Sequence, residues 1–421
     1  MENRVFPISK LNIEVLDGDR GKNYPHQDEL FKKGHCLFLS ASNVTRDGFQ
    51  FGSTMFISKE KDEVLRGGKL CRNDIVITTR GTVGNVAYYD ENVPYKDIRI
   101  NSGMLIVRCG KELNSKYVYY VLRSPEFQKQ IRSIQTGSAQ PQLPKSHFIK
   151  MLICVPKLEI QNKITSILSV LDRKIENNAK INDNLQQQAR TIFHEWFIAP
   201  LQTDGSDETE FGMLPYGFST KKVGELPIIV TDYVANGSFA SLKTNVKLYQ
   251  EPNYAYFIRN TDLKSDTFEV YVDEHSYNFL SKSRLFGGEI IISNVGDVGS
   301  VFLCPILDAP MTLGNNIIML KPECDELRYY LYIWFKWSFG QGLIQGIKGG
   351  SAQPKFNKTD FRALPVILPP RELLRKFNLT VNPMFKAIEG NRSQNRNLAS
   401  LRDALLPKLM AGELDVSDVK L

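Results

Sequence analysis

The same twelve-residue peptide occurs twice in the chain, and this repeat constrains the fold more than any other feature. The first copy, residues 137–148, reads GSAQPQLPKSHF, and the second copy, residues 350–361, reads GSAQPKFNKTDF. Seven of the twelve positions are identical. Because a chance match of this length is improbable, we infer that the chain contains an internal duplication.

The duplication extends well upstream of the peptide. Residues 67–89 match residues 285–303, and both read as an apolar strand, a turn with two glycines and a second apolar strand. Residues 116–133 and 326–345 follow as helices with apolar residues at spacings of three and four. We interpret their aromatic residues as helix packing rather than as a base-stacking surface. The sequence therefore predicts two copies of a mixed strand-and-helix domain.

A long segment without glycine or proline follows the first copy, and a similar segment follows the second. In both, apolar residues recur at alternating spacings of four and three, which is the heptad seam of a coiled coil, with two asparagines at its middle. We predict that the two seams pair with each other and that the asparagines pair to penalise a slipped register. The alternative is two amphipathic helices that each pack on their own domain. The predicted seam residues are Ile164, Leu168, Leu171, Ile175, Asn178, Asn182, Leu185, Met384, Ile388, Asn391, Asn395 and Leu398.

Pro383 departs from this pattern, because it lies just inside the second seam. A proline is tolerated in the first turn of a helix and disrupts a helix interior. We therefore expect Pro383 either to start the distal helix or to kink it.

These patterns predict an α+β chain of five segments. They are a first domain at 1–156, a central long helix at 157–199, a polar linker and lead-in at 200–226, a second domain at 227–370, and a distal long helix with a tail at 371–421.

Composition excludes several classes of protein. The six cysteines are scattered without a Cys-x-x-Cys pair, and the histidines do not cluster, so neither a disulfide framework nor a metal site is expected. No apolar run is long enough to span a membrane and the N-terminal residues lack a signal-peptide core, so we expect a cytoplasmic protein. The net charge of +7 is compatible with a nucleic-acid partner.

Catalytic motifs are missing from the sequence. We find no phosphate-binding loop, no dinucleotide-binding glycine motif and no nucleophile elbow. No catalytic, cofactor-binding or metal-binding residue is therefore predicted.

Basic and carboxamide side chains gather around the repeated peptide and the glycine turn. Lysine and arginine neutralise phosphates, and glutamine can bond adenine bidentately in the major groove. The identical peptide core serves as a scaffold as readily as a reader, so we expect base discrimination in segments that differ between the copies, such as 12–66 and 232–284. The predicted DNA-binding residues are Thr79, Arg80, Thr82 and Asn294 in the turns, and Ser138, Gln140, Gln142, Lys145, Ser351, Gln353, Lys355 and Lys358 around the peptides.

Together these features resemble a known family. Two domains that each carry a Gly-Ser-x-Gln-Pro loop and a following long helix are similar to the DNA specificity subunit of type I restriction–modification systems. The lead-in EFGMLPYGFSTKKVGEL (210–226) and the C-terminal LRDALLPKLMAGEL (401–414) are also similar to that family, although a tryptophan commonly stands at the position of Phe218. The resemblance covers nearly the whole chain.

The resemblance implies a fold and a division of labour. Two target-recognition domains would be separated by an antiparallel coiled coil with pseudo-twofold symmetry, and each would read one half of an asymmetric, bipartite double-stranded DNA target. The chain itself would not be an enzyme. Its partners would be two methyltransferase subunits acting on adenine N6 and ATP-dependent restriction subunits, with S-adenosylmethionine, ATP and magnesium bound by those partners. Phe193, Trp196 and Phe197 are candidates either for an apolar partner anchor or for capping the coiled coil.

Two other functions remain open from the sequence. One is a two-headed DNA-binding regulator without an enzymatic partner. The other is a self-contained DNA methyltransferase or nuclease, which the missing catalytic motifs disfavour.

Overall fold

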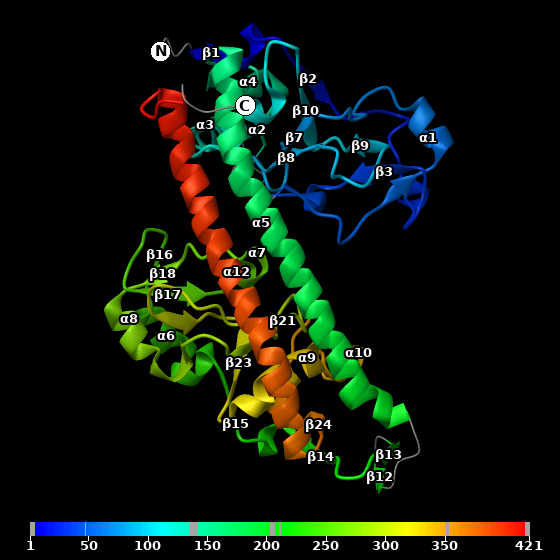
Figure 1. Cartoon of the computed structure of the whole chain (residues 1–421), viewed down its shortest axis with the longest axis vertical. Helices are drawn as coiled ribbons and strands as arrows, with labels where there is room; N and C mark the ends of the chain where they lie inside the picture. Colours follow the sequence, from blue (N-terminus) through cyan, green and yellow to red (C-terminus); the bar gives the residue numbers. More distant parts are fainter. Residues whose placement is uncertain are drawn as a thin grey trace. The chain divides into compact units, whose positions relative to one another are not determined.

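The computed structural model describes residues 5–46, 48–134, 142–202, 207–209, 212–350 and 353–416. It divides into two compact units (Figure 1), of which the first is Met1–Arg173 with Leu398–Leu421 and the second is Lys174–Asn397. Among the described residues, no helix combines the length and the apolar character needed to cross a membrane.

The first unit is built on a four-stranded antiparallel sheet. Its strands lie in the order β2 (Ile13–Asp17), β10 (Met104–Cys109), β7 (Ile75–Thr78) and β8 (Val86–Tyr88). One face packs on helices through a core that includes Ile75, Ile77 and Tyr117. The opposite face packs on a smaller sheet, so both faces of the central strands are buried and the strands read as continuous apolar runs.

The remaining elements of the first unit surround this sheet. The smaller sheet consists of β6, β3 and β9, with β3 and β9 parallel. The bounds are β1 Val5–Pro7, β3 Cys36–Leu39, β4 Val44–Thr45, β5 Gly48–Phe49, β6 Phe56–Ile57, α1 Lys59–Val64, β9 Ile98–Ile100, α2 Ser115–Arg123, α3 Pro125–Ile134, α4 Lys145–Phe148 and β11 Leu152–Cys154.

The second unit repeats this architecture. Its main sheet has the order β15 (Ile228–Asp232), β23 (Ile317–Pro322), β20 (Ile290–Ser293) and β21 (Val301–Leu303), which matches the order of the first sheet strand for strand. A five-stranded sheet, in the order β16-β18-β17-β22-β19, replaces the smaller sheet of the first unit. The other bounds are β12 Asp207–Thr209, β13 Gly212–Leu214, β14 Ser219–Lys222, α6 Phe239–Asn245, β16 Leu248–Tyr249, β17 Ala255–Ile258, α7 Asn260–Ser265, β18 Tyr271–Val272, α8 Glu274–Phe279, β19 Arg284–Leu285, β22 Met311–Leu313, α9 Arg328–Lys336, α10 Ser338–Gly346, α11 Lys358–Arg362 and β24 Pro365–Leu368.

Individual hydrogen bonds recur at equivalent positions of the repeat, which confirms the duplication. The Tyr117 hydroxyl donates to the Cys154 carbonyl at 3.0 Å, and Tyr330 makes the corresponding bond to Ile367. The lead-in strands also correspond, since β1 pairs with β11 and β14 pairs with β24, both antiparallel.

The helices predicted at 116–133 and 326–345 are each broken in two, so the prediction of single helices was wrong. Ser124 and Trp337 leave the helical region, with ψ angles of 148° and 154°. In the first copy Pro125 explains the break, because a proline disfavours the helical conformation of the residue before it. In both copies a glutamine on the following helix, Gln128 or Gln341, donates to a carbonyl at the break, that of Leu122 or Phe335.

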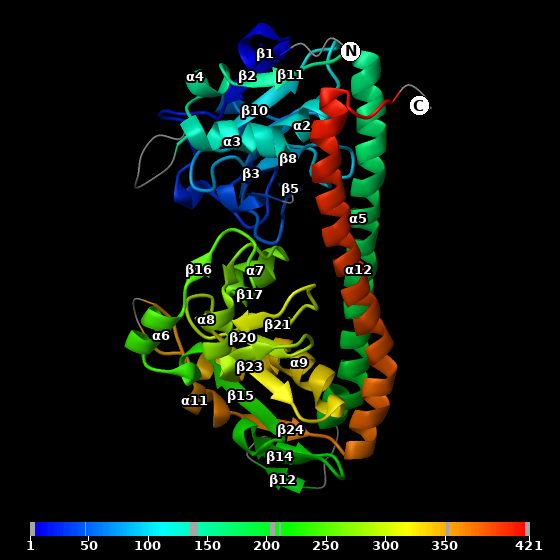
Figure 2. The same ribbon diagram turned by 90° about the vertical axis from the view of Figure 1, so that its left-hand side faces the viewer.

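Helices α5 (Leu158–Phe193) and α12 (Arg371–Ala411) are the two long helices, and they lie side by side in both views (Figures 1 and 2). A π-helical turn, His194–Ile198, ends α5. Pro383 lies in the interior of α12, so of the two expectations the helix start is wrong.

The predicted asparagine pairs are present and they show that the helices run antiparallel. In the second unit the Asn178 side chain donates to Asn395 at 2.8 Å, and the Asn391 side chain donates to Asn182 at 2.8 Å. In the repeat Asn178 corresponds to Asn391 and Asn182 corresponds to Asn395, so each pair is the image of the other. This exchange is the signature of a local pseudo-twofold relationship. No predicted seam residue is exposed.

The outer parts of the seam pack on the domains. Both predicted arrangements therefore occur, pairing of the two helices and packing of each helix on a domain. Ile164 and Leu168 are buried in the core of the first unit with Leu406 and Leu409 of α12. Ile388 is buried in the core of the second unit. The helices therefore pair with each other at the asparagines and with a domain core at their ends.

Candidate nucleic-acid interface

The glycine turn and the segment after the repeated peptide meet at one end of the first sheet. The turn follows β7, and its Thr79 carbonyl accepts a hydrogen bond from the Leu143 amide at 3.0 Å. The Thr79 amide donates in turn to the Gly103 carbonyl at 2.7 Å, and Arg80 forms an isolated antiparallel bridge with Gln142. The two segments that the sequence predicted separately are thus one surface.

The second unit forms the same junction with equivalent backbone bonds, and the Asn294 side chain adds a bond to the Phe356 carbonyl at 3.3 Å. The Phe356 amide donates to the Asn294 carbonyl at 3.0 Å, and the Asn294 amide donates to the Asn316 carbonyl at 3.1 Å. Val295 forms the bridge with Lys355. We call these two surfaces the first and the second turn–loop junction.

The glycines of the turns are required by backbone geometry. Gly84 and Gly299 have φ angles of +95° and +96°, which favour glycine. Side-chain amides brace both turns, because Gln128 donates to the Gly84 carbonyl at 2.9 Å and Gln341 donates to the Gly299 carbonyl at 2.8 Å. A Cβ at either glycine would lie 2.9 Å from the bracing glutamine oxygen. The turns are therefore fixed in the same shape in both units.

The predicted contact residues differ in exposure. Arg80, Thr82, Gln353 and Lys355 are exposed, whereas Gln142 and Asn294 are half-buried. Thr79 is 6% exposed, so its backbone, and not its side chain, contributes to the junction. Ser138, Gln140 and Ser351 lie outside the described residues.

The two lysines shared by the repeated peptides are paired with acids. The Lys145 ammonium lies 3.9 Å from an Asp17 oxygen, and the Lys358 ammonium lies 3.2 Å from an Asp232 oxygen. Both aspartates are the last residues of the first strand in their sheets. Sequence reasoning missed these acids, although their equivalent positions in the two copies were a signal. Part of the charge of each lysine is therefore compensated within the protein.

Arg20 is a further basic residue of the first junction that sequence reasoning missed. Its guanidinium contacts Asp17 at 3.2 Å and the Ser102 carbonyl at 3.4 Å, next to Gly103. Its side chain is 57% exposed. The residue adds an accessible positive charge beside the first turn.

A cluster of His35, Asp62 and Asp97 has the spacing of a metal site, but its charges are already satisfied. The Lys69 ammonium contacts Asp62 at 2.6 Å and Asp97 at 2.9 Å. Burial opposes ionisation of Asp62, but hydrogen bonds from Lys69 and Arg99 hold the pKa of its carboxyl below the ordinary value. We interpret the cluster as a structural ion network.

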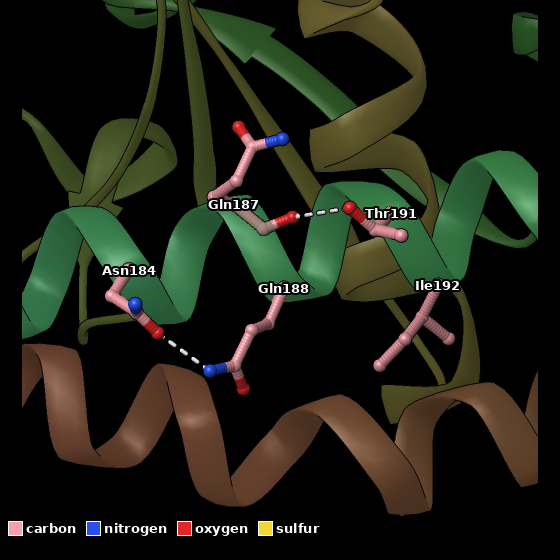
Figure 3. Close-up of a pocket in the computed structure, with 5 residues that line it drawn as sticks. All are labelled: Asn184, Gln187, Gln188, Thr191 and Ile192. Carbon is pink, nitrogen blue, oxygen red and sulfur yellow. Dashed lines mark hydrogen bonds between the residues drawn. The ribbon is translucent and has the colours of Figure 1, made fainter.

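The pocket on helix α5 also offers no catalytic chemistry. It has a volume of about 330 Å³ and is lined by residues of α5 alone, with Gln188 donating to Asn184 at 2.5 Å and Thr191 donating to the Gln187 carbonyl at 3.1 Å (Figure 3). The remaining lining residue is Ile192. Neutral amide and hydroxyl groups that bond one another do not form an acid, base or nucleophile.

The aromatic residues at the end of α5 are core residues. Phe193 and Phe197 are 0% and 1% exposed and pack around Tyr330 and Phe377 of the second unit. Trp196 is half-buried against the same core. The partner-anchor interpretation of Phe193 and Phe197 is therefore wrong, because their side chains are not accessible.

Comparison with known proteins places this architecture in a family. The model of the type I restriction modification DNA specificity domain matches the chain twice, over residues 13–187 and over residues 221–373. This chain belongs to that family, whose members supply DNA recognition rather than catalysis. Each match contains one turn–loop junction.

Individual relatives have low sequence identity to this chain. The chain is 27% identical over 360 residues to the type I restriction enzyme MjaIX specificity subunit of Methanocaldococcus jannaschii, covering 83% of this chain and 79% of the relative. It is 20% identical over 465 residues to the HindI specificity subunit of Haemophilus influenzae, covering 94% and 98%. Among solved structures, a type I restriction–modification S subunit from M. genitalium covers 96% of this chain and 95% of its own, with 18% identity and a TM-score of 0.48.

Proposed function

We propose that this chain reads a bipartite, asymmetric DNA target, one half with each turn–loop junction, as the specificity subunit of a type I restriction–modification complex. The observation that carries this proposal is that the two junctions share their backbone bonds and differ in the side chains that they carry. A shared backbone supports docking on DNA in the same manner. Different side chains at base-reading positions support two different half-sites.

The spacer between the half-sites is, in this proposal, set by the paired helices. The asparagine pairs allow one register of α5 against α12, because a slipped register would leave buried amides without partners. The number of base pairs between the half-sites would then be fixed, whereas their sequence would not be recognised.

The proposed partners are two methyltransferase subunits that act on adenine N6, joined by ATP-dependent restriction subunits. S-adenosylmethionine, ATP and magnesium would be bound by these partners. Exposed apolar residues on the long helices support docking there, since Val170 and Ile181 of α5 are 54% and 48% exposed and Leu379 of α12 is 64% exposed. Exposed apolar groups on helices are favourable contacts for a partner helix.

The test is the adenine methylation map of the host genome with this gene present and with it deleted. We expect one bipartite motif to disappear on deletion while all other methylated motifs stay. An unchanged map, with the neighbouring methyltransferase gene expressed, contradicts the proposal. In that case binding of S-adenosylmethionine by the purified chain separates a self-contained methyltransferase from a DNA-binding regulator.

A further inference from the structure

We propose that two cross-strand pairs, Arg80–Gln142 and Val295–Lys355, are equivalent base-reading pairs of the two junctions. Arg80 takes a guanine in one half-site, and Val295 takes the methyl group of a thymine at the corresponding position of the other. This assignment rests on the proposed function and names the residues that make its half-sites differ.

The equivalence of the pairs follows from the backbone. Arg80 corresponds to Val295 in the repeat, and Gln142 corresponds to Lys355. Both pairs form isolated antiparallel bridges. The residues before Arg80 and Val295 make the same two backbone hydrogen bonds in each unit. A difference in what the two junctions recognise must therefore come from the side chains.

The bridge also determines how these side chains are placed. Residues that face each other across an antiparallel bridge project from the same side of the strands, with Cβ atoms about 5 Å apart. Arg80 and Gln142 thus form one side-chain pair, and Val295 and Lys355 form another. Two groups at this separation match neighbouring base edges in a major groove.

The cations of these pairs are available to a ligand. Arg80 and Lys355 are exposed, and within the described ranges no hydrogen bond or ion pair uses either charged group. By contrast, Lys145 and Lys358 face Asp17 and Asp232. In the second turn, the carboxylate of Asp297 is bound by Lys264 at 2.6 Å and does not compensate Lys355.

The chemistry of the side chains gives the expected bases. An arginine fork donates two hydrogen bonds to O6 and N7 of guanine, and a glutamine amide bonds N6 and N7 of adenine. Valine cannot make either contact, but its methyl groups can pack on the C5 methyl of thymine. Lysine donates to guanine as a point charge. The first pair is therefore a two-base hydrogen-bonding reader, and the second combines an apolar contact with a single donor.

The experiment selects binding sites from a randomised duplex library with the full chain in complex with its methyltransferase subunits. It compares wild type with Arg80→Val, Arg80→Lys and Val295→Arg. Neither position has a side-chain hydrogen bond or ion pair to lose among the described residues, so the variants should fold. Lys111→Ala is the matched control, because it removes one exposed charge beyond the opposite end of β10.

We expect Arg80→Val to reduce discrimination for guanine about 10- to 100-fold at one position of one half-site, with the other half-site unchanged. Arg80→Lys should retain overall affinity at low salt and lose part of the same discrimination. Val295→Arg should shift the preference at one position of the other half-site towards guanine. The control should change none of these preferences.

Other results overturn the assignment in distinguishable ways. If Arg80→Val weakens all sequences alike and lowers the salt dependence by about one charge, Arg80 is a phosphate contact. If Arg80→Val changes several positions of both half-sites, or Val295→Arg changes none, the pairs are not equivalent readers. If the wild-type complex selects a bipartite site, the proposed function stands in either case. If it selects no sequence at all, both proposals fail.

Discussion

Asp172 of α5 and Arg402 of α12 form a half-buried ion pair at 2.9 Å, at positions where the other half of the repeat has no charge. In the repeat Asp172 corresponds to Phe385 and Arg402 corresponds to Ala189, and both of these residues are buried in the apolar core of the second unit. Tyr120 donates a further hydrogen bond to Asp172 at 2.5 Å. Equivalent positions of the long helices are thus stabilised by an ion pair in the first unit and by apolar packing in the second.

We expect Arg402→Ala to lower the free energy of unfolding of the first unit by about 3 kcal/mol, because Asp172 would keep its charge in a half-buried place without its cation. The double variant Asp172→Leu with Arg402→Leu should cost less than the single variant. Thermal and urea unfolding measure both. A single variant that is as stable as wild type would show that the pair contributes nothing.

The asparagine pairs should differ in strength although they are related by the repeat. Asn178 donates to both Asn395 and Gln394 at 2.8 Å, whereas Asn391 donates to Asn182 alone among the described contacts of its amide nitrogen. We therefore expect Asn178→Ala to cost about 2 kcal/mol and Asn391→Ala about 1 kcal/mol of unfolding free energy. Equal effects in urea titrations of the two variants would contradict this difference.

The glutamine braces offer a variant that acts on one half-site at a time. Gln128→Ala removes the donor to the Gly84 and Leu122 carbonyls, so the first turn should loosen. We expect binding at the first half-site to weaken about 10-fold with unchanged base preference. Gln341→Ala should do the same to the other half-site, which makes each variant the control for the other. A changed base preference in either variant would mean that the glutamine itself reads bases.

The ion network of the first unit should make its stability depend on acid. Asp62 has a lowered pKa, so its contribution to stability is present above the unfolded pKa of about 3.9 and is lost as pH falls through the lower folded value. We expect Asp62→Asn to cost about 3 kcal/mol at pH 7 and progressively less below pH 4. Unfolding curves of both proteins between pH 2 and pH 7 test this. A difference that grows on acidification would reverse the assignment.

Pro383 should limit the stability of α12. Proline in a helix interior lacks the amide that would bond the carbonyl four residues before it and clashes with that carbonyl. Since Pro383 is exposed, we expect Pro383→Ala to raise the free energy of unfolding by about 1 to 3 kcal/mol. Lys386→Ala, an exposed change on the same helix, should stay within about 0.5 kcal/mol of wild type. No gain for Pro383→Ala would indicate that the helix has already adapted to the proline.

Patterns with a period or a repeat were the part of the structure that the sequence predicted well. The heptad spacing predicted that the central asparagines of the two helices pair, without showing which asparagine meets which, and the paired glycines predicted the turns at Gly84 and Gly299. Pro125 indicates the break at Ser124, but the prediction of one continuous helix did not take this proline into account. The signal at Trp337 is weaker: it is Gly340, where a Cβ would clash with the Trp334 carbonyl oxygen, and the Phe335 carbonyl is satisfied by Gln341.

Contacts between distant segments that share no periodic pattern were beyond sequence reasoning. Nothing local marks Asp17 as the partner of Lys145, because strand order brings them together. A helix pattern does not show which domain core covers Phe193, so the sequence left partner binding open for this residue. The sequence predicted the turn residues and the loop residues as separate groups, and the fold brings them together in one junction in each unit.

The backbone bonds of the junctions have a consequence for how such a protein can change over generations. The turn is held against the loop mainly by backbone amides and carbonyls, which every amino acid except proline supplies in full, and in the second unit the Asn294 side chain adds a bond to the Phe356 carbonyl at 3.3 Å. The side chains of Arg80 and Lys355, by contrast, are exposed and make no hydrogen bond or ion pair among the described residues. Substitution of one of these side chains should therefore cost little folding stability. The recognised DNA sequence can then change in single mutational steps without an unstable intermediate protein.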